Sequence, residues 1–466
     1  MAARCSAALA LYLAIGATPA LGSDGTPGED TLANQGVLEL SPGADLTTVV
    51  ARHGFTVLES IPSRGLHLVA FEPALTEGQF ELLSDPLTGD PDITDSELNR
   101  ASGDQGSGTQ SMFASRTNAE FLNQPLWSIL GVPAANLSAT GQGITVAVID
   151  SGIDTDHPMF AGRIHPGAIN LLGDPADFDE SGNGIDDDGD LLIDEMLGHG
   201  TFVAGIILGV APDATILPIR VMNDEGVGDA FTVAHAVYYA IDHGADVINL
   251  SLGSEAELRL IEKAIDRATH RGIIVVASAG NEGETAPEYP AATNKVAGIA
   301  ATDTAGVLAP FSNRGDHILF CAPGTQIIGP QVDGWGAADG TSAAAPLVAG
   351  TAALVIERGT VLHYEHFRSM ARKTAIDIED VNPGIDEDFL GFGLLNVQDA
   401  VAWTGPCFAD LAEDDLLNVD DINAFITLFL AGDEHVDLAE PRGVLNVNDI
   451  EFFVDAFLGG CPIEGP

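Results

Sequence analysis

The stretch ITVAVI at residues 144–149 is an uninterrupted apolar run, and it decides how the middle of the chain folds. Similar runs follow at ILPIRVM (216–222), DVINLSL (246–252) and IIVVASA (273–279). Residues 231–244 and 257–272, which lie between these runs, indicate helices that end at glycine. Continuous apolar strands that alternate with helices predict a parallel sheet with helices on both faces, which is an α/β fold.

Three reactive side chains stand next to such elements. Asp150 directly follows ITVAVI, His199 begins a predicted helix in GHGTFVAG, and Ser342 begins another in GTSAAAP, with Pro346 expected in its first turn. Parallel sheets bind their ligands beyond the carboxyl ends of the strands. Each residue alone fits a turn or a helix cap. Together, in the order Asp–His–Ser, they favour an orienting acid, a base and a nucleophile.

The motifs AVIDSGID, GHGTFVAG and GTSAAAP resemble the three catalytic motifs of subtilisin-like serine proteases, and residues from about 118 to 403 follow that family's layout. The resemblance implies a subtilisin-like parallel sheet flanked by helices. It also implies that Ser342 attacks the scissile carbonyl, His199 accepts and returns the proton, and Asp150 holds the imidazole. One departure is Phe202, where the family usually has a second histidine.

The same resemblance assigns the surroundings of the serine. Asn281, in ASAGNEG, would form the oxyanion hole with the Ser342 backbone N–H, although AGN after a strand also fits a plain turn. An extended polypeptide substrate would pair with SLG, and the segment before Asn281 would line the pocket for the residue before the cut. The implied substrate-binding residues are Ser251, Leu252, Gly253, Ala279 and Gly280.

The apolar N-terminal segment and the excess of acidic residues indicate where the protein is located and which partners it can bind. Residues 1–22 have the pattern of a secretory signal peptide, and no other segment approaches 18 apolar residues, so we expect a secreted protein without a membrane span. Acidic residues number 69 against 18 Lys and Arg, which gives a formal net charge of −51. This charge disfavours nucleic acid as a partner.

Residues 23–115 precede the predicted catalytic domain at 116–404. After a flexible leader at 24–36, the pattern indicates a strand, a helix closed by Gly54 and two further strands. This small α+β unit resembles the subtilase propeptide, which implies a self-processing zymogen; an unrelated small binding domain is the alternative. The Gly- and Ser-rich linker at 100–116 is then the expected maturation site.

Residues 405–466 contain an internal repeat, in which LLNVDDINAF recurs 28 residues later as VLNVNDIEFF. They resemble a dockerin module with EF-hand-like calcium loops, which implies a cohesin-like or cell-surface partner. The ligands of the first loop would be Asp410, Asp414, Asn418 and Asp421, whereas the second loop is interrupted. Cys407 and Cys461 bracket this segment and are expected to pair, while Cys321 is expected to be a buried free thiol.

A second candidate calcium site is the acidic segment at 179–195, where Asp186, Asp188 and Asp190 alternate. Asp194 is a further candidate ligand, and a solvated acidic loop is an equal alternative. The sequence thus predicts a secreted, calcium-supported serine endopeptidase made as a zymogen. The competing hypothesis is a catalytically silent, subtilase-fold, calcium-dependent binding or assembly protein.

Overall fold

The structure is a computed structural model. It describes residues 31–71, 87, 89–103, 116–180, 182, 184, 193–194, 196–332, 334–404, 419–431, 436, 445–447, 449–450 and 453–454. The chain divides into two compact units, the first built mainly from residues up to Ser102 and the second from the remainder. The predicted signal peptide lies outside the described residues.

The first unit is a small antiparallel sheet with one helix. Its elements are β1 (Thr31–Leu40), α2 (Leu46–His53), β2 (Thr56–Ile61), β3 (Leu66–Ala70) and β4 (Ile93–Gly103). The strands lie side by side in the order β2, β3, β1, β4. Asp45 accepts hydrogen bonds from the first turn of α2, and Gly54 ends that helix in the left-handed conformation (φ 77°). Leu38, Val49 and Val69 form its buried core.

Two boundaries in this unit differ from the prediction. Strand β1 begins at Thr31, inside the expected flexible leader, and β4 continues to Gly103, inside the expected linker. The two strands pair with each other, and Thr31 stands opposite Arg100. Backbone hydrogen bonds to a distant strand thus order residues whose polar, glycine-containing composition suggested a flexible chain.

The second unit contains a seven-stranded sheet in the order β12-β11-β10-β9-β5-β7-β6, and every pairing in it is parallel. Its strands are β5 (Thr145–Asp150), β6 (Ile169–Asn170), β7 (Thr215–Arg220), β9 (Val247–Leu250), β10 (Ile274–Ser278), β11 (Val296–Thr302) and β12 (Ile318–Pro323). The four apolar runs of the sequence form the adjacent strands β10, β9, β5 and β7, which confirms the predicted parallel sheet.

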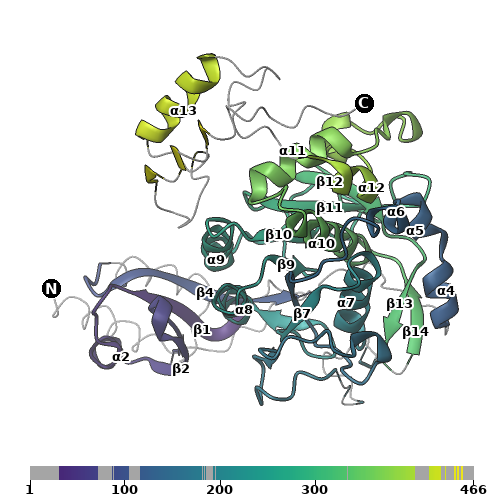
Figure 1. Ribbon diagram of the computed structural model, residues 1–466. Coiled ribbons are helices and arrows are strands. Elements are labelled where there is room, and N and C mark those ends of the chain that lie inside the picture. Colours follow the sequence, from purple (N-terminus) through teal and green to yellow (C-terminus); the bar gives the residue numbers. More distant parts are fainter. Residues whose placement is uncertain are drawn as a thin grey trace. The chain divides into compact units, whose positions relative to one another are not determined.

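Helices cover both faces of this sheet. Figure 1 shows α7 and α10 on one side of it and α8 and α9 on the other. The longer helices are α7 (His199–Val210), α8 (Ala230–Asp242), α9 (Arg259–Thr269), α10 (Thr341–Glu357) and α11 (Tyr364–Thr374). Helix α10 is buried along most of its length and packs against α7 and the central strands. The helix pair thereby fixes the distance between the starts of α7 and α10.

Shorter elements complete the unit. They are α4 (Asn118–Asn123), α5 (Pro125–Ile129), α6 (Val132–Ala135), β8 (Val227–Asp229), the hairpin of β13 (Ile327–Gln331) and β14 (Gly334–Ala338), and α12 (Val397–Ala402). Farther along, α13 (Val419–Ala431) carries the first copy of the repeat. Among the helices that the structure describes, none has the length and hydropathy needed to cross a membrane.

Candidate active site

The end of β5 and the start of α7 bring an acid and a histidine together. Asp150 is the last residue of β5, and His199 is the first residue of α7. His199 Nδ1 lies 2.6 Å from Asp150 Oδ1, and both side chains are about 1% exposed. A Cβ at Gly200 would lie 2.1 Å from the Gly152 carbonyl oxygen, so only glycine lets the helix start this close to the strand.

Ser342 is the second residue of α10 and is 4% exposed. Because α10 begins at Thr341, Pro346 stands inside the helix, and the expectation that it lies in the first turn was wrong. Proline has no N–H to donate to the carbonyl four residues earlier, which is that of Ser342. Ser251 Oγ donates to this carbonyl instead, at 3.4 Å, and itself accepts from Asn249 Nδ2 at 2.9 Å.

Asn281 follows β10 and is 7% exposed. Its Oδ1 accepts from the Thr341 backbone N–H at 2.8 Å and from Thr341 Oγ1 at 3.0 Å, which leaves the Nδ2 end as the donor. A Cβ at Gly340 would lie 3.7 Å from Ser342 N and 3.8 Å from Asn281 Nδ2. The two nitrogen atoms therefore border the same open space, which a side chain at Gly340 would fill.

The predicted substrate-binding residues continue two neighbouring strands. Ser251, Leu252 and Gly253 follow β9, while Ala279 and Gly280 follow β10. These strands are paired in parallel, with Leu250 opposite Ala277, so both segments leave the sheet at its carboxyl edge. Asp150, Asn281 and the two segments thus lie at the edge where parallel sheets bind ligands.

Comparison with known proteins decides the family. Residues 141–393 match the model of the subtilase family. Subtilisin BL of Lederbergia lenta is 35% identical over 287 residues, which cover 59% of this chain and 97% of the relative. This chain belongs to the subtilase family. It is therefore a subtilisin-like serine endopeptidase, and the predicted enzyme class is confirmed.

Other relatives agree with this assignment. Thermitase of Thermoactinomyces vulgaris is 35% identical over 232 residues, covering 47% of this chain and 77% of the relative. Fervidolysin of Fervidobacterium pennivorans, a keratinolytic enzyme related to subtilisin, shares the fold with a TM-score of 0.64 and 24% identity. That match covers 82% of this chain and 62% of fervidolysin, which is less than two thirds of its length.

Glu180 is a buried carboxylate that the sequence analysis of this subtilase missed. It is 5% exposed, and it accepts hydrogen bonds from Ser151 Oγ and from the backbone and hydroxyl of Thr201. These partners follow Asp150 and lie in the first turn of α7. Burial raises the pKa of Glu180, and the nearby Asp150 carboxylate acts in the same direction. Its place in the acidic segment at 179–195 carries no signal of burial.

We expect Glu180→Gln to change how stability depends on pH. A folded-state pKa above the unfolded one contributes stability at low pH that is lost as pH rises through the folded pKa. The urea midpoint of the parent should therefore fall relative to that of Glu180→Gln as pH rises above the ordinary Glu range. All three tryptophans lie in the second unit, so their fluorescence reports its unfolding.

Both proteins should carry Ser342→Ala so that self-digestion does not interfere. Glu180→Ala serves as the comparison, because it leaves Ser151 and Thr201 without their acceptor and should be about 1–3 kcal/mol less stable than Glu180→Gln at every pH. Urea midpoints of the parent and Glu180→Gln that stay parallel across pH would show that the Glu180 carboxyl does not titrate abnormally.

The structure describes few of the predicted calcium ligands. Asp186, Asp188, Asp190, Asp410, Asp414 and Asn418 lie outside the described residues, and Asp421 lies in α13. Asp194 accepts a hydrogen bond from the Gly184 backbone at 2.9 Å. Across the described parts of the chain, no group of three or more His, Cys, Asp or Glu residues is placed to hold a metal ion.

Of the four cysteines in the sequence, the structure describes Cys321. Cys321 is a fully buried free thiol, as predicted, and burial raises its pKa to about 12. A thiol with such a pKa is not a nucleophile at neutral pH. Cys407 and Cys461, expected to pair, lie outside the described residues.

Proposed function

We propose that Asp150, His199 and Ser342 are the catalytic triad of this subtilase. The observation that carries the proposal is the buried 2.6 Å contact between His199 Nδ1 and Asp150 Oδ1. A carboxylate on Nδ1 holds the ring in the tautomer that leaves Nε2 as the base, and it stabilises the imidazolium. His199 then takes the Ser342 proton as Oγ attacks the scissile carbonyl, and returns it to the leaving amine.

The developing oxyanion would be bound by two donors. Asn281 Nδ2 and the Ser342 backbone N–H border the space beside Gly340, and both Thr341 hydrogen bonds orient the Asn281 amide. The start of α10 also points N–H groups at negative charge. Because the donors are held before substrate arrives, they cost no reorganisation during the reaction.

The substrate is a polypeptide bound in extended form. Its backbone would pair with Ser251–Gly253, and the side chain before the cut would enter between Gly253 and Ala279–Gly280. The segments that follow β9 and β10 leave the sheet at the same edge, so an extended substrate could pair with one of them as an added strand.

The remaining parts suggest how the enzyme is made. We assign residues 1–22 to a signal for secretion and residues 23–115 to a propeptide, with cleavage in the linker after β4. The separate hydrophobic core of the first unit supports this role, because a propeptide must fold as its own body. Calcium binding at 179–195, and a dockerin-like anchor at 405–466 that binds a cohesin-like or cell-surface partner, complete the proposal.

The test uses the purified full-length chain with casein, with and without a sulfonyl fluoride that acylates reactive serines. We expect self-cleavage after β4, casein digestion, and loss of both on treatment, with the adduct found by mass spectrometry on Ser342. An arm with a chelator measures the calcium requirement. No digestion in calcium-containing buffer and no adduct on Ser342 would reject the triad and favour the catalytically silent binding protein.

A further inference from the structure

The two glycines that border the proposed entry for the substrate side chain face one carboxylate. A Cβ at Gly253 would lie 1.9 Å from Glu288 Oε1, and a Cβ at Gly280 would lie 1.7 Å from Glu288 Oε2. Glu288 therefore lies against both backbone segments at once. A substrate side chain that enters between these segments meets the Glu288 carboxylate.

The backbone at Glu288 is tied to the substrate-binding segment. Tyr289, the next residue, forms an antiparallel bridge with Ser254, which directly follows Gly253. The Ser254 N–H donates to the Tyr289 carbonyl at 2.8 Å, and the Tyr289 N–H donates to the Ser254 carbonyl at 2.9 Å. This pairing sets where the Glu288 side chain begins.

A buried amide also orients the carboxylate. Asn313 is 3% exposed, and its Nδ2 donates to Glu288 Oε2 at 3.2 Å and to Glu282 Oε2 at 2.7 Å. The Asn313 backbone N–H donates to the Gly280 carbonyl at 3.0 Å, and its Oδ1 accepts from the Glu282 and Glu284 backbones at 3.2 and 2.9 Å. One neutral donor group thus gathers two carboxylates at this place.

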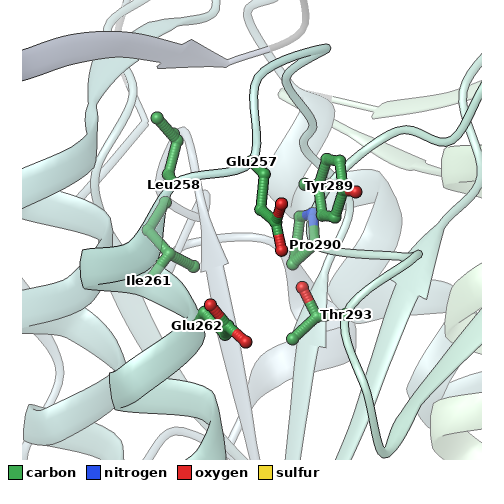
Figure 2. Close-up of a pocket in the computed structure, with 7 residues that line it drawn as sticks. All are labelled: Glu257, Leu258, Ile261, Glu262, Tyr289, Pro290 and Thr293. Carbon is green, nitrogen blue, oxygen red and sulfur yellow. The ribbon is translucent and has the colours of Figure 1, made fainter.

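Further negative charge lies next to Tyr289, the residue that follows Glu288. Figure 2 shows Tyr289 and Pro290 lining a hollow opposite the start of α9, with the carboxylates of Glu257 and Glu262 beside them. Burial and these two carboxylates raise the pKa of Tyr289. On the Glu282 side, the Arg314 guanidinium donates to the Gly283 carbonyl at 2.7 Å.

We infer that Glu288 determines specificity and directs this enzyme to cleave after arginine or lysine. The inference rests on the proposed binding mode. A guanidinium or ammonium group supplies both charge and donors to the carboxylate, and charge-assisted hydrogen bonds are about twice as strong as neutral ones. An apolar side chain would instead displace water from the carboxylate and offer it nothing in return.

The experiment uses the full-length chain after it has cleaved itself. It compares kcat/KM on four fluorogenic peptides that differ only in the residue before the cut, which is Arg, Lys, Phe or Leu. We expect Arg and Lys to exceed Phe and Leu by about 10- to 100-fold, the range of one hydrogen bond to a charged group. Glu288→Gln keeps the shape and removes the charge, so the Arg-to-Phe ratio should fall at least tenfold. Glu284→Gln removes a charge from the exposed side of the same segment and should leave the ratio unchanged.

The results that would overturn the role of Glu288 differ from those that would reject the proposed function. Equal cleavage after Arg and Phe, a preference for small residues, or an unchanged ratio in Glu288→Gln would overturn the inference. Sulfonyl fluoride titration of Ser342 in every variant corrects for misfolded enzyme, because only a folded site reacts. Failure of the proposed function looks different, since then neither casein nor any of the four peptides is hydrolysed and Ser342 is not labelled.

Discussion

Ser342→Ala is expected to lower kcat for peptide hydrolysis by about 10⁶-fold, a magnitude known for subtilisin, a relative of this chain, and carried over from it. Alanine keeps the helix start and the Asp150–His199 contact but removes the only atom proposed to attack the carbonyl. The measurement is turnover of the preferred fluorogenic peptide by purified protein. The same variant should remain uncut after β4, which gel electrophoresis shows.

A second variant separates loss of the nucleophile from loss of the fold. His199→Ala should lose about as much activity, and the double variant should lose no more than either one, because the two residues act as one unit. Both single variants should keep the tryptophan fluorescence of the parent. Turnover by Ser342→Ala within tenfold of the parent would mean that another group attacks the carbonyl.

Asn281→Ala is expected to lower kcat by about 10²–10³-fold with little change in KM; this magnitude also comes from subtilisin. The amide is proposed to bind the oxyanion, which exists only in the transition state, so substrate binding should be spared. The measurement is the separate determination of kcat and KM on one peptide. Sulfonyl fluoride titration gives the concentration of competent enzyme.

Asn123→Ala, on the exposed face of α4, is the matched control and should change neither constant. Thr341→Val tests the orientation of the amide, because it removes the hydroxyl that bonds Asn281 Oδ1 at 3.0 Å and keeps the backbone bond at 2.8 Å. Its effect should be smaller than that of Asn281→Ala. A rise in KM at constant kcat in Asn281→Ala would contradict this prediction, because it would mean that the amide binds the substrate before the reaction rather than the oxyanion.

Much of the catalytic unit could be predicted because its signals are local. Strands β5, β7, β9 and β10 are continuous apolar runs, and a glycine follows α8 and α9 within three residues, so neighbouring residues suffice to recognise these elements. Strands β11 and β12 were not predicted. The sequence VAGIAAT of β11 has small residues and a glycine, and only its burial between two other strands makes it a strand.

The residues of the site also fall into those that local sequence motifs reveal and those that only the tertiary structure reveals. Asp150, His199, Ser342 and Asn281 stand in short motifs next to recognisable elements, so the chain itself points to them. Glu180 and Glu288 stand in no such motif. Their roles arise from contacts across the fold, such as the bond between Glu180 and Thr201, which are 21 residues apart.

The amino-acid sequence by itself therefore determined the α/β class, the family and the identity of the candidate catalytic residues, because each depends on patterns within a few residues. Only the tertiary structure decided that Ser251 bonds the Ser342 carbonyl across 91 residues, and that Glu288 lies against Gly253 and Gly280. The physical reason is that strand order and helix packing bring these groups together, and neither is encoded in local periodicity.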